Sequence, residues 1–140
     1  MQYLKNTFIL LVVTLFTFSS CSKDEAPATS NVLLQGRWKI SLYVENGTDK
    51  LSLFNGYQFV FTDNGVVTAT QSGSSSSFTG SWSAKYEDKQ NKLNLNFGST
   101  AFFSELNEDW KVVEKTNSKI RLEHSSGGNG GTDLLTFERL

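Results

Sequence analysis

The sequence predicts an all-β domain, an up-and-down antiparallel meander of eight or nine short strands. Apolar and polar residues alternate with a period of two through most of the chain after residue 34, as strands with one buried face require. Helical periodicity is nearly absent from the same region. Asn-Gly pairs, which tolerate the positive φ angles of tight hairpins, separate the alternating runs at 46–47, 55–56 and 64–65.

The first half of this region contains four predicted strands. The first run places four apolar residues on one face: Trp38, Ile40, Leu42 and Val44. A weaker strand is predicted near residues 50–54, and the next run has Tyr57, Phe59 and Phe61 on one face. A further strand is predicted from Val66 to Gln71.

The second half follows a glycine-serine loop at 72–77. Its first run places on one face Phe78, Gly80, Trp82, Ala84 and Tyr86, and its second Leu93, Leu95 and Phe97. Residues 99–108 break the alternation, and they are predicted to form a short helical turn or a lid. Alternation returns at 110–113, 120–124 and 134–139, with a glycine-rich loop at 125–131.

A meander of this length either closes into a barrel or folds as a β-sandwich. Closure is favoured because it removes exposed sheet edges. Eight strands enclose an interior that side chains just fill or that holds one small ligand. The sequence leaves both states of the interior open.

Several motifs in this region resemble the lipocalin-like domains of bacterial lipoproteins. Gly36-Arg37-Trp38 heads the first strand, residues 57–61 precede an Asn-Gly turn, and Gly80-Ser81-Trp82 lies in mid-chain. The resemblance covers residues 34–140 and implies an eight-stranded barrel. It also implies structural roles for Gly36 and Trp38, with the tryptophan at the closed end of the barrel beneath a basic residue of the last strand, Arg139.

The chain before this domain is predicted to be a leader and a tether. Residues 8–18 form an apolar run of eleven residues after Lys5, too short for a membrane-spanning helix of about 20. A charged start, a short apolar centre and small residues at the end are typical of a signal peptide, here residues 1–20. Residues 21–33 are predicted to be a lipidated cysteine and a flexible tether, because 22–31 is small, polar and aperiodic.

Ser19-Ser20-Cys21 resembles a bacterial lipobox, with Phe18 where leucine is usual. The resemblance implies cleavage before Cys21, the sole cysteine, and lipidation of its sulfur and its new amino terminus. Ser22-Lys23-Asp24-Glu25 resembles a short export signal of Gram-negative surface lipoproteins. The implied location is the outer membrane, with a lipid anchor and exposure at the cell surface; the periplasmic face is the alternative.

Composition argues against several classes of function. The net charge is −1 at pH 7 and no run of basic residues occurs, which argues against nucleic-acid binding. His124 is the sole histidine, so a multi-histidine metal site is excluded. The acidic residues Glu105, Glu108 and Asp109 form a carboxylate pair, a weak calcium site or, as we expect, a solvated loop. We predict a non-enzymatic protein without a cofactor or a metal.

Aromatic residues provide the functional hypothesis. An apolar pocket lined by rings is how a barrel binds a hydrophobic molecule, so we predict a small hydrophobic or amphipathic ligand. The alternative is a filled barrel that acts as a scaffold and binds a protein or glycan through loops 72–77 and 125–131. The candidate ligand-binding residues are Tyr57, Phe59, Phe61, Trp82, Phe97, Phe102 and Phe103, the last two as a lid.

Overall fold

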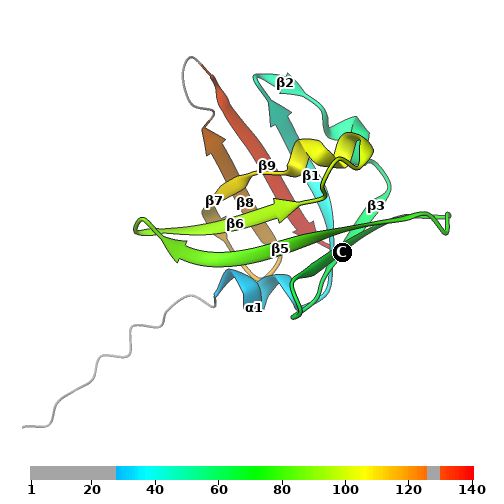
Figure 1. Cartoon of the computed structure of the whole chain (residues 1–140), viewed down its shortest axis with the longest axis horizontal. Helices are drawn as coiled ribbons and strands as arrows, with labels where there is room; N and C mark the ends of the chain where they lie inside the picture. The colour runs from blue at the N-terminus through cyan, green and yellow to red at the C-terminus, as the bar shows by residue number, and fades with distance from the viewer. Residues whose placement is uncertain (1–27, 126–129) are drawn as a thin grey trace, which may run out of the picture.

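A computed structural model describes residues 28–125 and 130–140 of the chain. They form one antiparallel sheet of nine strands in the order β2-β1-β3-β4-β5-β6-β7-β8-β9 (Figure 1). β1 also pairs with β9, and this pairing closes the sheet into a barrel of eight strands with β2 as an addition at the edge of β1. The predicted all-β barrel is confirmed, and the sandwich alternative is wrong because the first and last strands meet.

The strands occupy the alternating runs in chain order. Their bounds are β1 Arg37–Glu45, β2 Thr48–Asp49, β3 Tyr57–Phe61, β4 Val66–Gln71, β5 Ser77–Glu87, β6 Gln90–Asn96, β7 Asp109–Lys115, β8 Lys119–Ser125 and β9 Thr132–Arg139. The helical elements are α1 Thr29–Leu33 and two 3-10 helices, η1 Leu51–Phe54 and η2 Ala101–Leu106. None of the helices in the described ranges is long and apolar enough to cross a membrane.

The strand predicted at 50–54 is wrong, since residues 51–54 form η1. Asp49 Oδ1 accepts a hydrogen bond from the backbone N–H of Leu51 at 2.8 Å. The N–H of Lys50 is already bonded to the carbonyl of Tyr43 in β1, at 2.9 Å. A side-chain bond two residues along the chain turns the backbone out of an extended path, so the strand stops at Asp49.

The predicted face of β1 is correct only in its first half. Trp38 and Ile40 are buried as expected, but Tyr43 replaces Leu42 and Val44 as the next buried residue. The pairing of β1 with β9 shifts register between Ile40 and Leu42. A bulge adds one residue to a strand and moves every later side chain to the opposite face.

The domain begins earlier than predicted, at Thr29 and not at residue 34. Residues 29–33, assigned to the tether, form α1, in which Val32 and Leu33 are buried in the core. The indole N–H of Trp38 donates to the carbonyl of Leu33 at 3.0 Å and fixes the helix against the barrel. The predicted leader, Cys21 and residues 22–27 lie outside the described residues.

The two ends of the barrel differ. α1 covers one end, which we call the closed end, together with the turns at 62–65, 88–89 and 116–118 (Figure 1). η1 and η2 lie at the opposite end, which we call the mouth, with the turn at 46–47 and the loop at 72–76 (Figure 1). Successive connections between the barrel strands therefore alternate between the mouth and the closed end, as an up-and-down meander requires.

Candidate functional site

Six of the seven candidate ligand-binding residues are buried, and Phe102 is half-buried. Phe103 is fully buried at the mouth, where it lies at the centre of an aromatic cluster. Its ring centroid lies 4.7–6.3 Å from those of Phe54, Tyr57, Phe59, Phe78, Phe97 and Phe102. Most of these contacts are edge-to-face or tilted, the arrangements that aromatic rings prefer. The cluster occupies the mouth through which a ligand would reach the interior.

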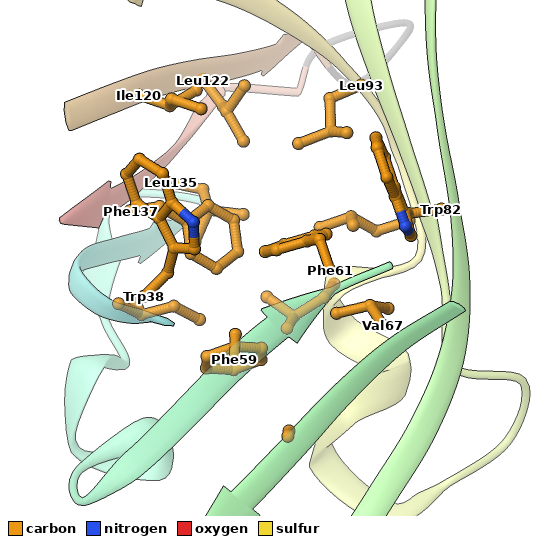
Figure 2. Packing of buried hydrophobic residues seen from close by; sticks show 14 of the residues in the cluster. Trp38, Phe59, Phe61, Val67, Trp82, Leu93, Ile120, Leu122, Leu135 and Phe137 are labelled. Carbon is orange, nitrogen blue, oxygen red and sulfur yellow. The ribbon is translucent and has the colours of Figure 1, made fainter. Parts of the chain in front are cut away.

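A second set of rings continues toward the closed end (Figure 2). Phe61 lies between Trp82 and Phe137, with ring centroids 5.5 Å and 5.6 Å away. Phe137 in turn contacts Phe59 at 5.4 Å. Rings from β3, β5 and β9 thus pack against one another inside the barrel, and they favour the filled interior over the hollow one.

η2 is held at the mouth by polar contacts as well as by Phe103. The side chain of Asn107 accepts from the N–H of Phe97 and donates to the carbonyl of Gly98, both at 2.6 Å. The indole N–H of Trp110 donates to the carbonyl of Leu106 at 3.0 Å. The predicted helical turn is therefore present, and it acts as a plug that is bonded to the strands on both sides.

Tyr43 joins β1 to this plug, and sequence reasoning missed it because the bulge was not recognised. Its hydroxyl donates to the carbonyl of Glu105 at 3.0 Å. Burial raises the pKa of Tyr43, and the carboxylates of Glu45 and Glu105 raise it further. Lys50 forms ion pairs with both carboxylates, and their hydrogen bonds raise the pKa of its ammonium. These polar contacts therefore link β1 and the start of η1 to η2 beside the aromatic cluster.

An open groove lies beside the plug, where β1 and β3 separate. The ladder between these strands includes Trp38↔Phe59 but does not continue beyond it, and the same edge of β1 pairs with β2 only from Val44. η1 lies beside the part of β1 and β3 that is not paired, and a groove of about 370 Å³ remains there. We call it the seam groove; its lining is Ile40, Leu51, Phe54, Tyr57 and Leu140 among apolar residues, and Lys39, Ser41, Asn55, Gln58 and Ser72 among polar ones.

The seam groove combines an apolar wall with a rim of hydrogen-bonding groups. Its volume falls within the range of about 300–1,000 Å³ that is usual for small-molecule sites. Tyr57 is the one predicted ligand-binding residue that lines it. The other lining residues were missed, because their proximity depends on where the β1–β3 ladder ends.

The acidic residues near η2 do not converge on one point. Glu105 pairs with Lys50 at 3.2 Å, and Asp109 pairs with Lys92 at 3.0 Å. Glu108 Oε2 lies 3.3 Å from His124 Nε2. Because each carboxylate has a different basic partner, the arrangement is that of separate surface pairs. A shared proton between two carboxylates needs the opposite geometry.

His124 stands between two carboxylates on the outer part of the mouth. Besides Glu108, Asp133 Oδ2 lies 3.7 Å from its Nδ1. The other oxygen of Asp133 accepts from the N–H of Asn46 at 2.8 Å, so this carboxylate ties β9 to the β1–β2 turn. Within the described ranges, no group of three or more metal-ligating side chains has the geometry to hold an ion.

The closed end has the predicted contact between the first and last strands. The guanidinium of Arg139 lies 5.8 Å from the ring of Trp38 and donates to the backbone carbonyl of Gln35. Gly36 has φ +140°, and a Cβ there would lie 3.1 Å from Arg139 Nε. The backbone conformation therefore favours glycine at this position, and any larger residue would also displace the side chain of Arg139 slightly.

Comparison with known proteins shows the fold. A solved DUF4847 family protein from Bacteroides vulgatus matches with a TM-score of 0.51 and 15% identity, over 79% of this chain and 96% of that one. The chain shares its barrel fold with that protein. An uncharacterized protein from Bacteroides eggerthii gives a TM-score of 0.45 and 20% identity, over 74% of this chain and 97% of its own. No family model and no curated protein matches the sequence.

Proposed function

We propose that the protein is an outer-membrane lipoprotein, anchored through Cys21, whose barrel is a non-enzymatic binding domain for a small amphipathic ligand. The observation that carries the proposal is the seam groove, an apolar-walled opening of about 370 Å³ with polar groups at its rim. The filled interior supports a site at this groove over one inside the barrel. The separate pairing of Glu105, Glu108 and Asp109 supports binding over catalysis.

Lys39 gives the groove a preference among amphipathic ligands. It lies at the rim and has no carboxylate within ion-pair distance in the described residues. The apolar side chains of Ile40, Leu51 and Phe54 line the same groove. An anionic headgroup at Lys39 with a short acyl or aromatic tail against η1 satisfies both parts of the lining.

Titration of the chain from residue 22 onward with a fluorescent fatty acid tests this proposal. Saturable one-to-one binding is expected, and Leu51→Arg should abolish it because a charge would enter the apolar wall. Val113→Arg, the same change on the outer surface of β7, should leave it intact. Lys39→Gln should weaken the binding of the fatty acid by about two- to fivefold. It should leave unchanged the binding of the alcohol with the same tail, which has no carboxylate to meet the ammonium. No saturable binding, or equal loss in both arginine variants, would contradict the groove as a site.

The anchor is tested separately. Mass spectrometry of the mature protein should find a diacylated or triacylated Cys21 at the amino terminus. Protease treatment of whole cells then distinguishes the surface from the periplasmic face. A free thiol on an exported chain would contradict the anchor and leave the groove hypothesis standing.

The second candidate is an interaction module with a filled barrel, which the ring packing supports. The loop at 72–76 lies at the mouth, and so do the ends of β8 and β9 that flank the second candidate loop (Figure 1). Residues 126–129 of the second loop lie outside the described residues. Cross-linking in the cell envelope should recover a protein or glycan that is lost when the 72–76 loop is shortened to a two-residue turn.

A further inference from the structure

The chain enters the folded domain at the closed end of the barrel. Ala28 is the first described residue, and α1 follows it directly across that end (Figure 1). Seven residues after Cys21 reach Ala28, and a fully extended segment of this length spans about 25 Å. An anchor at Cys21 therefore keeps the closed end near the bilayer, and this inference rests on the anchor proposed above.

Charge is distributed unequally between the two ends. The closed-end segments 34–40, 60–67, 84–91, 112–121 and 136–140 contain eight basic and five acidic side chains. The mouth segments 43–57, 69–79, 95–109, 123–125 and 130–134 contain seven acidic side chains and one lysine, besides His124. An anionic surface would attract the closed end and repel the mouth.

Several cations of the closed end are available to a partner. Apart from Lys39, which lines the seam groove, Arg37, Lys85 and Lys89 have no carboxylate within ion-pair distance among the described residues. Lysine and arginine near an anionic membrane each contribute on the order of 1 kcal/mol of attraction, or about a fivefold change in affinity. Three such groups at one end together contribute about 3 kcal/mol, which is enough to orient a tethered domain.

The exposed large hydrophobic residues are found at the same end. Tyr86 is 72% exposed and Leu140 is 59% exposed. The other large hydrophobics exposed in the described ranges also fall in the closed-end segments, and none falls in the mouth segments; they are Leu34, Val60 and Val113, each 38% exposed. Soluble proteins commonly expose single apolar residues, but a bias of this kind toward one basic end marks a surface for contact.

Tyr86 lies next to the residues through which the chain enters the domain. It lines a small groove of about 130 Å³ with Ala28, Thr29 and Ser30, and its neighbour Lys85 lines the same groove. The two side chains leave the end of β5 on opposite faces of the strand, so the ring of Tyr86 can enter the bilayer interface on one side while the ammonium of Lys85 meets phosphate on the other. This region therefore lies against the first described residues of the chain, where the segment that follows Cys21 enters the domain.

We propose that the closed end is a membrane-docking surface for anionic phospholipid headgroups, centred on Lys85 and Tyr86. Docking holds the closed end of the barrel against the membrane, so the mouth and its loops face away from it. A freely swinging domain would present all its surfaces equally, whereas a docked one presents the mouth.

Co-sedimentation of the mature chain, Cys21 to Leu140, with vesicles tests the proposal. Vesicles of phosphatidylglycerol and phosphatidylethanolamine should bind the chain in a salt-sensitive manner, and phosphatidylcholine vesicles should bind it at least fivefold more weakly. Lys85→Gln should weaken binding to the anionic vesicles by about fivefold. Lys111→Gln is the matched control, an exposed strand lysine outside both end segments, and should change it little. Equal losses in the two variants, or no preference for anionic lipid, would overturn the proposal.

A second measurement decides the matter if the untethered chain binds too weakly to sediment. The Cys21 thiol of the leaderless chain is coupled to a maleimide lipid in the same vesicles, which makes the test independent of native lipidation. Hydrogen exchange at 84–91 should then slow severalfold relative to the uncoupled chain, and exchange at 72–76 should not. Tyr86→Ser should reduce this protection. Unchanged exchange at 84–91, or recovery of an envelope protein through the same residues, would refute a lipid partner.

Discussion

Replacing Phe103 with alanine is the most direct test of the plugged mouth. The ring is fully buried and lies within 6.3 Å of six other rings. Phenylalanine-to-alanine changes in cores cost about 3–5 kcal/mol, and the upper part applies where the surroundings cannot collapse into the space. The neighbouring rings extend from β3, β5, η1 and the end of β6, which the barrel holds apart. We therefore expect a loss of about 4 kcal/mol in the free energy of unfolding.

Urea unfolding followed by tryptophan fluorescence measures this loss, and thermal unfolding should show a fall in Tm of about 15 °C. Phe102→Ala is the matched control: this ring stacks on Phe103 at 4.7 Å but is half-buried. It should cost about 1–2 kcal/mol, since less apolar area leaves the core. A loss below about 1 kcal/mol for Phe103→Ala, or the same loss for both variants, would show that η2 is a loose lid and not a plug.

Three further predictions follow from other parts of the barrel. A Cβ at Gly80 would lie 2.8 Å from both a backbone oxygen and a ring carbon at the end of β6, so Gly80→Ala should cost about 1–3 kcal/mol in urea unfolding, whereas Ser81→Ala should cost little. Arg139→Ala should cost about 1–2 kcal/mol and change the fluorescence of Trp38, whereas an unaltered stability would show that the cation–π contact contributes nothing. Because the pKa of Tyr43 is raised by burial, the unfolded chain loses this phenol proton first as pH rises above about 10, and stability should fall by up to about 1.4 kcal/mol per pH unit. Tyr43→Phe should flatten that fall between pH 9 and 11, and an identical slope would contradict the assignment.

The alternation of apolar and polar residues and the Asn-Gly turns predicted most of the strands, because both signals depend only on residues that are neighbours in the chain. The run at 66–71 became β4 with the same bounds, and the turn at 64–65 has Gly65 at φ +79° as its Asn-Gly signal requires. The buried faces of β3 and of 93–97 also agree with the alternation, since a strand with one face in the core has no other way to place its apolar residues.

The candidate site was only half predictable. Aromatic content indicated that rings would gather in the barrel, and they do, but it did not indicate whether they would line a cavity or fill it. Phe103 decides this, because it enters from outside the strands on η2 and contacts rings from several elements at once. The seam groove depends in the same way on where the β1–β3 ladder ends, which no local signal near Lys39 or Tyr57 specifies.

By itself the sequence predicted most of the strands and the hairpin turns, together with a lipid attachment at Cys21 that stays a prediction, because each depends on neighbouring residues alone. Only the tertiary structure decided that aromatic rings pack against one another across the interior, that Thr29–Leu33 belongs to the domain, and that basic and apolar surface gathers at one end. Those properties arise from distances between residues far apart in the chain, which closure of β1 on β9 fixes and a period of two cannot encode.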